Sequence, residues 1–170
     1  MPQSKSEPEL AVSSPSLGAK EPADFLMDST VVLLRALDGS RQRSALSIGV
    51  NVTELRVMSR LAEAGHATPS QLADSMNMTS GAITAISDSL ASAGLIERSA
   101  HPSDRRRHLL SLTDEGNAKM DGLYRGFTRT LRQSVANYSI EQQSIMATML
   151  IAMAASLSDA PASYEADVSP

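Results

Sequence analysis

The fold of this chain is decided by residues 94–116, which read GLIERSAHPSDRRRHLLSLTDEG. Two short apolar segments, 95–99 and 108–112, stand on either side of a loop at 100–107 that ends in three consecutive arginines. This pattern predicts a β-hairpin with a basic tip. Two short helix patterns separated by a tight turn come just before it. A helix-turn-helix followed by a basic hairpin suits a helix in the DNA major groove with an arginine-bearing loop beside it.

Helix signals divide residues 23–157 into six predicted helices around that hairpin. The first covers 23–46, and the second runs from an N-cap at Thr53 to Gly65. The next three begin at polar caps, which are the capping box Thr68-Pro-Ser-Gln71, then Thr79, then Thr113. A second capping box at 139–142 opens the last helix, which carries a long apolar stripe. We therefore predict a mostly α-helical fold with a small β-hairpin wing.

The composition excludes several classes of function. The chain has 170 residues, a net charge of −4 and no cysteine, which removes disulfides, thiolate zinc sites and cysteine-based redox sensing. Its three histidines are scattered and no phosphate loop or nucleophile motif occurs, so we expect no metal, no cofactor and no enzyme. No apolar run approaches the roughly 20 residues of a membrane span, and no signal-peptide core is present. We expect a cytoplasmic protein with disordered tails at 1–22 and 158–170.

The helix that follows Thr79 is the candidate DNA reader. Ile83, Ile86 and Leu90 recur at core spacing. The opposite face then shows Ser80, Gly81, Thr84, Ala85 and Asp88. Small side chains let a helix backbone approach base edges, hydroxyls can bond bases or phosphates, and the alanine methyl can meet a thymine methyl. Taken alone, this helix is explained equally well as a plain solvated face.

The charge run from Asp104 through Arg107 is the second candidate site. A solvated charge run is the ordinary explanation, but its place at a predicted hairpin tip after a helix-turn-helix favours DNA contact. Asp104 is placed to bond an arginine one or two positions on and to order the wing. The remaining arginines could then reach phosphates or the negative minor groove.

Residues 53–116 resemble the winged helix-turn-helix of the MarR family of bacterial transcription regulators. The specific blocks are LADSMNMTSGAITAISDSLASAGLIER, residues 72–98, and DRRRHLLSLTDEG, residues 104–116. The resemblance implies a domain at 23–157, with the winged helix-turn-helix at 53–112 between dimerisation helices at 23–46 and 113–157. Carried over by position, it implies a wing-ordering role for Asp104. It also implies DNA contacts by Ser70, Thr79, Ser80, Gly81, Thr84, Ala85, Arg105, Arg106 and Arg107.

The resemblance further implies an obligate homodimer that binds a pseudo-palindromic operator in double-stranded DNA. Repression would be relieved by a small anionic or phenolic ligand bound near the junction of the dimer and DNA-binding parts. From the residues alone, the stripe of the last helix could pack on the first helix of the same chain or on a partner chain. The expected dimerisation residues are Phe25, Leu26, Ile145, Met146, Met149, Leu150 and Met153.

The chain departs from the family pattern in its recognition helix, which contains no Lys or Arg. Family members often carry an arginine where this chain has Ala85, Ile86 and Ser87. Two functions therefore stay open. The first is a homodimeric, sequence-specific regulator, a repressor released by a ligand. The second is a winged-helix protein-interaction module, or an antagonist that heterodimerises with a regulator and binds DNA weakly, which the net negative charge favours.

Overall fold

The computed structural model describes residues 21–101 and 104–159, and for 104–106 it describes the backbone alone. The predicted tails fall almost wholly outside these ranges. The element order is α1 (Pro22–Ser47), α2 (Val52–Ala64), β1 (His66–Ala67), α3 (Pro69–Met76), α4 (Ser80–Ser92), β2 (Ile96–His101), β3 (Asp104–Leu112), α5 (Asp114–Ser134) and α6 (Ile140–Asp159). The prediction of a mostly helical fold with a small wing is confirmed.

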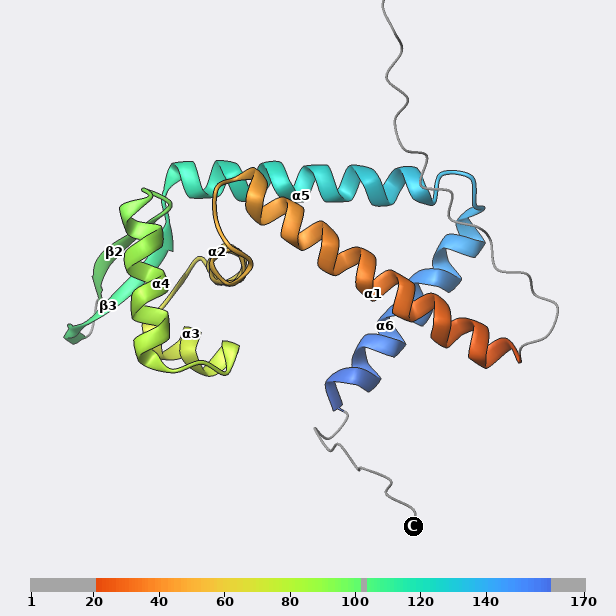
Figure 1. Cartoon of the computed structure of the whole chain (residues 1–170), viewed down its shortest axis with the longest axis horizontal. Coiled ribbons are helices and arrows are strands. Elements are labelled where there is room, and N and C mark those ends of the chain that lie inside the picture. The colour runs from red at the N-terminus through yellow and green to blue at the C-terminus, as the bar shows by residue number, and fades with distance from the viewer. Residues whose placement is uncertain (1–20, 102–103, 160–170) are drawn as a thin grey trace, which may run out of the picture.

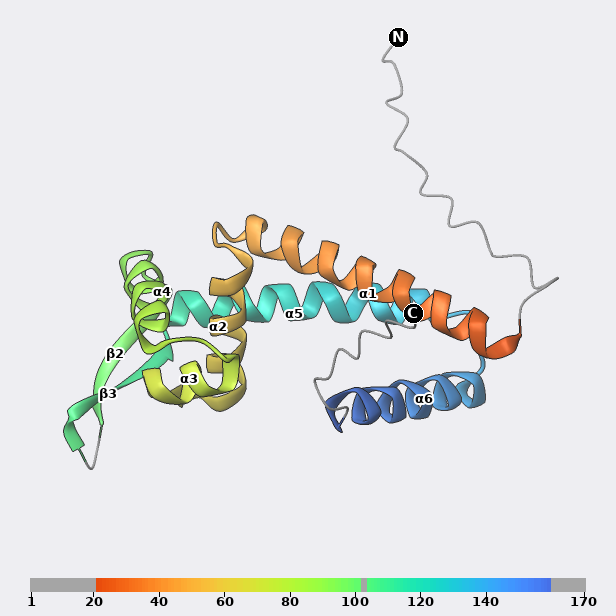
Figure 2. The same ribbon diagram turned by 60° about the horizontal axis from the view of Figure 1, so that its bottom comes forward.

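The elements form one lobe and three helices, α1, α5 and α6, that extend away from it; we call these three helices the arms. Helices α2, α3 and α4 gather with the sheet at one end of α5, and α5 runs out of this lobe as a rod (Figure 1). At the far end of α5 the chain reverses, and α6 turns back toward the lobe (Figure 2). Helix α1 runs from that far end to the lobe, where it connects to α2. The lobe therefore carries the helix-turn-helix, and the arms are the predicted dimerisation helices.

The hydrophobic core lies in the lobe. Its largest fully buried apolar side chains are Met58, Leu61, Leu72, Ile83, Leu90, Leu95 and Leu110. They come from α2, α3, α4 and the hairpin, so these elements hold one another in place. Helix α6 contributes no buried residue. Ala45 of α1 and Met120 and Leu123 of α5 also pack on this core, so only the parts of the arms next to the lobe share it.

The start of α2 corrects one predicted cap. Asn51, not Thr53, is the N-cap: its side-chain oxygen accepts from the Glu54 backbone N–H at 2.9 Å, and the Glu54 carboxylate accepts from the Asn51 N–H at 2.8 Å. This reciprocal pair satisfies two backbone donors, which explains why the helix begins two residues earlier than predicted. The predicted caps at Thr68, Thr79 and Thr113 are confirmed.

The hairpin corrects the predicted loop at 100–107. Strand β2 continues to His101 and β3 begins at Asp104, and these two residues pair across the ribbon after an irregularity at Ala100. The four charged residues from Asp104 to Arg107 therefore lie on a strand. The backbone ladder continues past the apolar segments because an antiparallel ribbon tolerates water on its faces. The two-residue strand β1, which pairs with β3 at Leu110 and Ser111, was missed because it is too short to form a pattern.

Candidate nucleic-acid interface

The turn between α3 and α4 fixes the helix-turn-helix through local hydrogen bonds. Thr68 opens α3, where its hydroxyl accepts from the Gln71 N–H at 3.3 Å and the Gln71 side chain accepts from the Thr68 N–H at 2.8 Å. Asn77 ends α3 in the left-handed conformation, at a φ of 53°. Thr79 then opens α4 by accepting from the Ala82 N–H at 3.2 Å. Three consecutive caps thus set where each helix starts and stops.

Helix α4 exposes the face that the sequence pattern predicts. Ile83 and Leu90 are buried in the lobe. The opposite side chains are exposed at Thr79, Ser80, Gly81, Thr84, Ala85 and Asp88. The hydroxyl of Thr84 donates to the Ser80 carbonyl at 2.9 Å. Ser70, in the first turn of α3, is also exposed. The contact of these residues with DNA stays a prediction.

The absence of a cation on α4 follows partly from packing. Of the three residues in the middle of α4, Ser87 is 1% exposed and donates to the Ile83 carbonyl at 2.7 Å. Ile86 packs half-buried against the core. Only Ala85 is exposed and could carry an arginine without rebuilding the core. The recognition face of this chain is therefore small and uncharged apart from Asp88.

The expected wing arginines lie on β3, the second strand of the hairpin. The backbone of Asp104, Arg105 and Arg106 belongs to β3, but their side chains lie outside the described part of the structure. The predicted contact between Asp104 and a wing arginine is therefore untested. Arg107 is exposed.

Side-chain contacts between elements hold α4 against its neighbours, and sequence reasoning missed them. Arg98 of β2 forms an ion pair with Asp88 of α4. At the other side of the helix, the Ser89 hydroxyl donates to the Glu54 carboxylate at 2.6 Å, which ties α4 to the start of α2. The only sequence signal for the pair of Asp88 and Arg98 is that two opposite charges stand ten residues apart. Two residues at that spacing meet only if β2 folds back along α4.

The predicted dimerisation residues lie on arms that the chain leaves uncovered. Leu26, Ile145, Met146, Met149 and Leu150 are exposed, and Met149 keeps 43% of its surface. Phe25 and Met153 are half-buried. Because α6 buries none of its residues, packing on α1 of the same chain does not cover its stripe.

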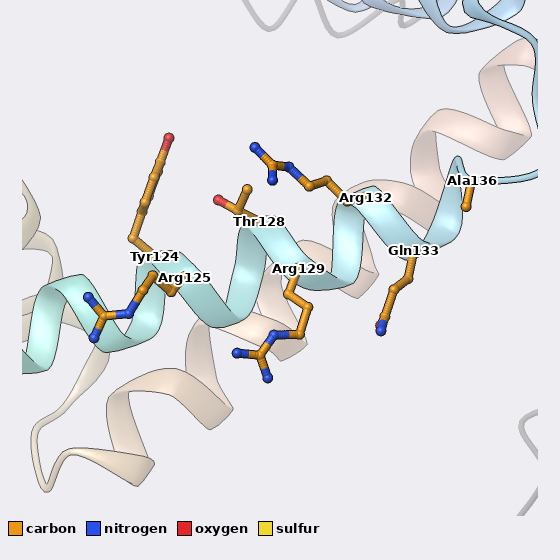
Figure 3. A pocket seen from close by; sticks show the side chains of 7 residues that line it. All are labelled: Tyr124, Arg125, Thr128, Arg129, Arg132, Gln133 and Ala136. Carbon is orange, nitrogen blue, oxygen red and sulfur yellow. The ribbon is translucent and has the colours of Figure 1, made fainter.

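Besides a hollow of about 640 Å³ between α1 and α5, two other hollows lie along α5. The first, of about 290 Å³, lies at the junction of α1, α2 and α5, and its lining includes Arg41, Ser59, Tyr124 and Phe127. The second, of about 540 Å³, is lined by α5 alone, and Figure 3 shows Arg125, Arg129 and Arg132 projecting from that helix. The hollow on α5 is therefore a basic surface, whereas residues of three helices line the junction hollow.

Residues 21–101 and 104–159 hold neither a metal-binding cluster nor a membrane-spanning helix. No cluster of three or more histidine, aspartate or glutamate side chains there could hold a metal ion. None of the helices described is both long enough and apolar enough to cross a membrane.

Helices α3 and α4 with the β2–β3 hairpin define a winged helix-turn-helix, a class of DNA-binding fold. The MarR family model matches residues 50–108. The chain is 30% identical over 134 residues to the transcriptional repressor MdtR of Bacillus subtilis, a match that covers 76% of this chain and 86% of MdtR. It is 32% identical over 83 residues to the B. subtilis repressor YetL, covering 49% of this chain and 50% of YetL, so it spans only half of that relative. The crystal structure of B. subtilis YusO superposes with a TM-score of 0.62 at 28% identity, covering 79% of this chain and 98% of YusO. The chain belongs to the MarR family of transcription regulators.

Proposed function

We propose that this chain is a homodimeric transcription repressor that reads double-stranded DNA with α4 and the wing, and that a small ligand releases it. One observation carries the proposal: α4 exposes small and hydroxyl side chains beside a hairpin that bears four arginines. In this class of fold the helix enters the major groove and the wing meets the backbone or minor groove. The relatives MdtR and YetL are both called repressors, which favours repression over activation.

The chemistry of the α4 face suits readout by small side chains. The hydroxyls of Ser80 and Thr84 can bond base edges or phosphates, and the Ala85 methyl can contact a thymine methyl. Backbone N–H groups in the first turn of α4 have no partner within the helix and can point at a phosphate. The arginines of β2 and β3 then supply the positive charge that α4 lacks.

A second copy of the chain is the partner that we propose for the arms. Helix α6 and the first half of α1 lie toward the end of the molecule away from the wing (Figure 1), and both carry exposed apolar side chains. A contiguous apolar surface on a helix that buries nothing else marks an interface. Because most homodimers are two-fold symmetric, the two α4 helices would read an inverted repeat in major grooves about 34 Å apart.

The junction hollow is the proposed ligand site. Arg41 can bind a carboxylate or phenolate, and Tyr124 and Phe127 can pack on an aromatic ring. The hollow lies between α1, which belongs to the arms, and α2, which belongs to the lobe. A ligand there would bind more tightly to a conformation with one angle between α1 and the lobe than to a conformation with another angle. It would therefore shift the population away from dimers whose α4 spacing fits DNA.

The experiment that tests this proposal is selection from a pool of genomic DNA fragments at two salt concentrations, with sedimentation velocity on the same sample. Recovery of a shared inverted repeat by a dimer supports the proposal. Compounds that carry an aromatic carboxylate or a phenol can then be tested for release of the recovered DNA, with Arg41→Ala as the control for the site. Recovery of nothing above background by a folded dimer contradicts DNA reading.

One observation favours a second function. The single charged residue on the α4 face is Asp88, and the net charge of the chain is −4. Such a surface suits a module that heterodimerises with a regulator and keeps it from DNA. Binding of no DNA, together with exchange of protomers with a second regulator in a mixing experiment, would favour this function.

A further inference from the structure

A hollow of about 570 Å³ lies between the recognition helix and the wing. Its walls come from the start of α3, the middle of α4 and both long strands, and they include Thr84, Arg98, Ser99 and His108. Thr84 also belongs to the exposed face of α4 that would meet DNA. The hollow therefore opens beside that face, between α4 and the wing.

Arg98 is the cation of this hollow. Its ion pair with Asp88 uses one terminal nitrogen, Nη2, whereas a guanidinium has five N–H donors. The side chain keeps 43% of its surface, and that of Asp88 keeps 59%. Asp88 thus holds the guanidinium at one corner and leaves its other donors accessible. An exposed pair of this kind is weak, so it orients Arg98 without trapping it.

Two further polar groups face the same hollow. Ser99 is exposed, and so is His108 across the ribbon. Neither side chain has a hydrogen-bond partner among the residues that the structure describes. A hydroxyl and an imidazole beside a guanidinium match the oxygens of a phosphate.

We infer that Arg98, oriented by Asp88 and flanked by Ser99, binds a phosphate of the DNA backbone between the recognition helix and the wing. Arg98 is a direct contact in this inference, and Asp88 is a positioning residue. The inference rests on the proposed function, because it needs DNA to lie against α4. It accounts for the missing cation of α4: the anchoring charge comes from the neighbouring strand and is held in place by an acid on the helix itself.

The test compares the salt dependence of binding for the wild-type dimer and four variants, on the recovered operator and on a scrambled duplex. Arg98→Ala removes one phosphate contact from each protomer, so the slope of log K against log salt becomes less negative by about 0.9 per protomer. Extrapolated from 1 M salt, that change corresponds to roughly eightfold weaker binding per protomer at 0.1 M. Because a phosphate contact is blind to sequence, both duplexes lose the same factor.

The other variants separate contact from structure. Arg98→Lys keeps the positive charge and should keep the wild-type slope. Asp88→Ala combined with Arg98→Ala removes the acid that the single variant leaves unpaired near DNA, so affinity should partly recover while the slope stays reduced. Arg60→Ala is the matched control, because Arg60 is similarly exposed and paired with Glu63 on α2, outside the hollow. It should leave the slope unchanged.

An unchanged slope in Arg98→Ala, with or without a loss of affinity, overturns the inference, since loss of a phosphate contact must reduce counterion release. A loss on the operator alone also overturns it, because it would make Arg98 a base contact. If the wild-type dimer binds neither duplex, the result contradicts the proposed function itself. That outcome differs from an unchanged slope in Arg98→Ala, which contradicts the inference alone.

Discussion

Gly116 offers a test in which the usual effect of a helical glycine is reversed. It lies in the first turn of α5, where it is buried, and a β-carbon added there would stand 2.1 Å from the Leu95 carbonyl oxygen and 3.3 Å from Cδ2 of Leu112. The Leu95 carbonyl is held in place because it accepts from the Thr113 N–H at 3.1 Å. The Thr113 hydroxyl in turn donates to the Gly94 carbonyl at 2.7 Å. Gly116→Ala must therefore push the start of α5 away from the end of α4 and the base of the wing.

The magnitude follows from opposing terms. Alanine in place of glycine stabilises a helix by about 1 kcal/mol. Against this, the methyl group must move by roughly 1 Å to reach a tolerable separation, and overpacking of this kind costs about 1–3 kcal/mol. Weakening the two Thr113 hydrogen bonds costs about 1 kcal/mol each. We expect a net loss of about 2–4 kcal/mol in the free energy of unfolding, and a melting temperature lower by roughly 10 °C.

The assay is urea and thermal denaturation at one fixed dimer concentration, because dimerisation makes stability depend on concentration. Gly122→Ala on the same helix is the control, since a β-carbon there would meet nothing within 4 Å. It should be neutral or stabilising by up to about 1 kcal/mol. A Gly116→Ala variant as stable as wild type, or more stable, would show that α5 is not held against Leu95 as described.

Three further changes test the wing, the arms and the helix-turn-helix. Arg106→Ala should weaken operator binding by about tenfold and leave the dimer folded; unchanged affinity at physiological salt, measured by fluorescence anisotropy, would count against a DNA role for this arginine. Met149→Glu places a charge in the proposed interface of α6, so sedimentation should show monomers at micromolar concentration; a persistent dimer would place the interface elsewhere. Thr68→Ala removes the cap of α3 and should lower the free energy of unfolding by about 1–2 kcal/mol in urea titrations, with Ser70→Ala as the exposed control.

The features predicted correctly from sequence are those encoded over a few consecutive residues. The caps at Thr68, Thr79 and Thr113 each accept a hydrogen bond from the backbone N–H three residues on. A segment of four residues therefore contains both partners of each interaction. The buried positions Ile83 and Leu90 follow from helical periodicity in the same way. The Asn51 cap was missed although its partner is equally close, because Thr53 offered a competing cap nearby.

The features that escaped prediction depend on how elements meet in space. The extent of the hairpin is set by backbone pairing between His101 and Asp104, which side-chain patterning does not report. The pair of Asp88 with Arg98 requires a particular angle between α4 and β2. The partner of α6 lies beyond the single chain, so periodicity identifies the apolar stripe but not the surface that covers it.

The distribution of charge on the lobe has a consequence for specificity. Non-specific affinity for DNA comes almost entirely from phosphate neutralisation, whereas sequence is read by base-edge contacts. In this chain α4 carries no cation, the neighbouring hairpin carries four arginines, and the one acid on the α4 face is paired with Arg98. Replacing Ala85 with arginine should therefore raise affinity for every duplex, because an added positive charge strengthens the attraction to phosphates irrespective of sequence. The ratio of operator to scrambled affinity should then stay constant or fall. A rise in that ratio would mean that an arginine at position 85 reads a base edge better than the alanine methyl does, and that the small α4 face of the natural chain reads less sequence than its geometry suggests.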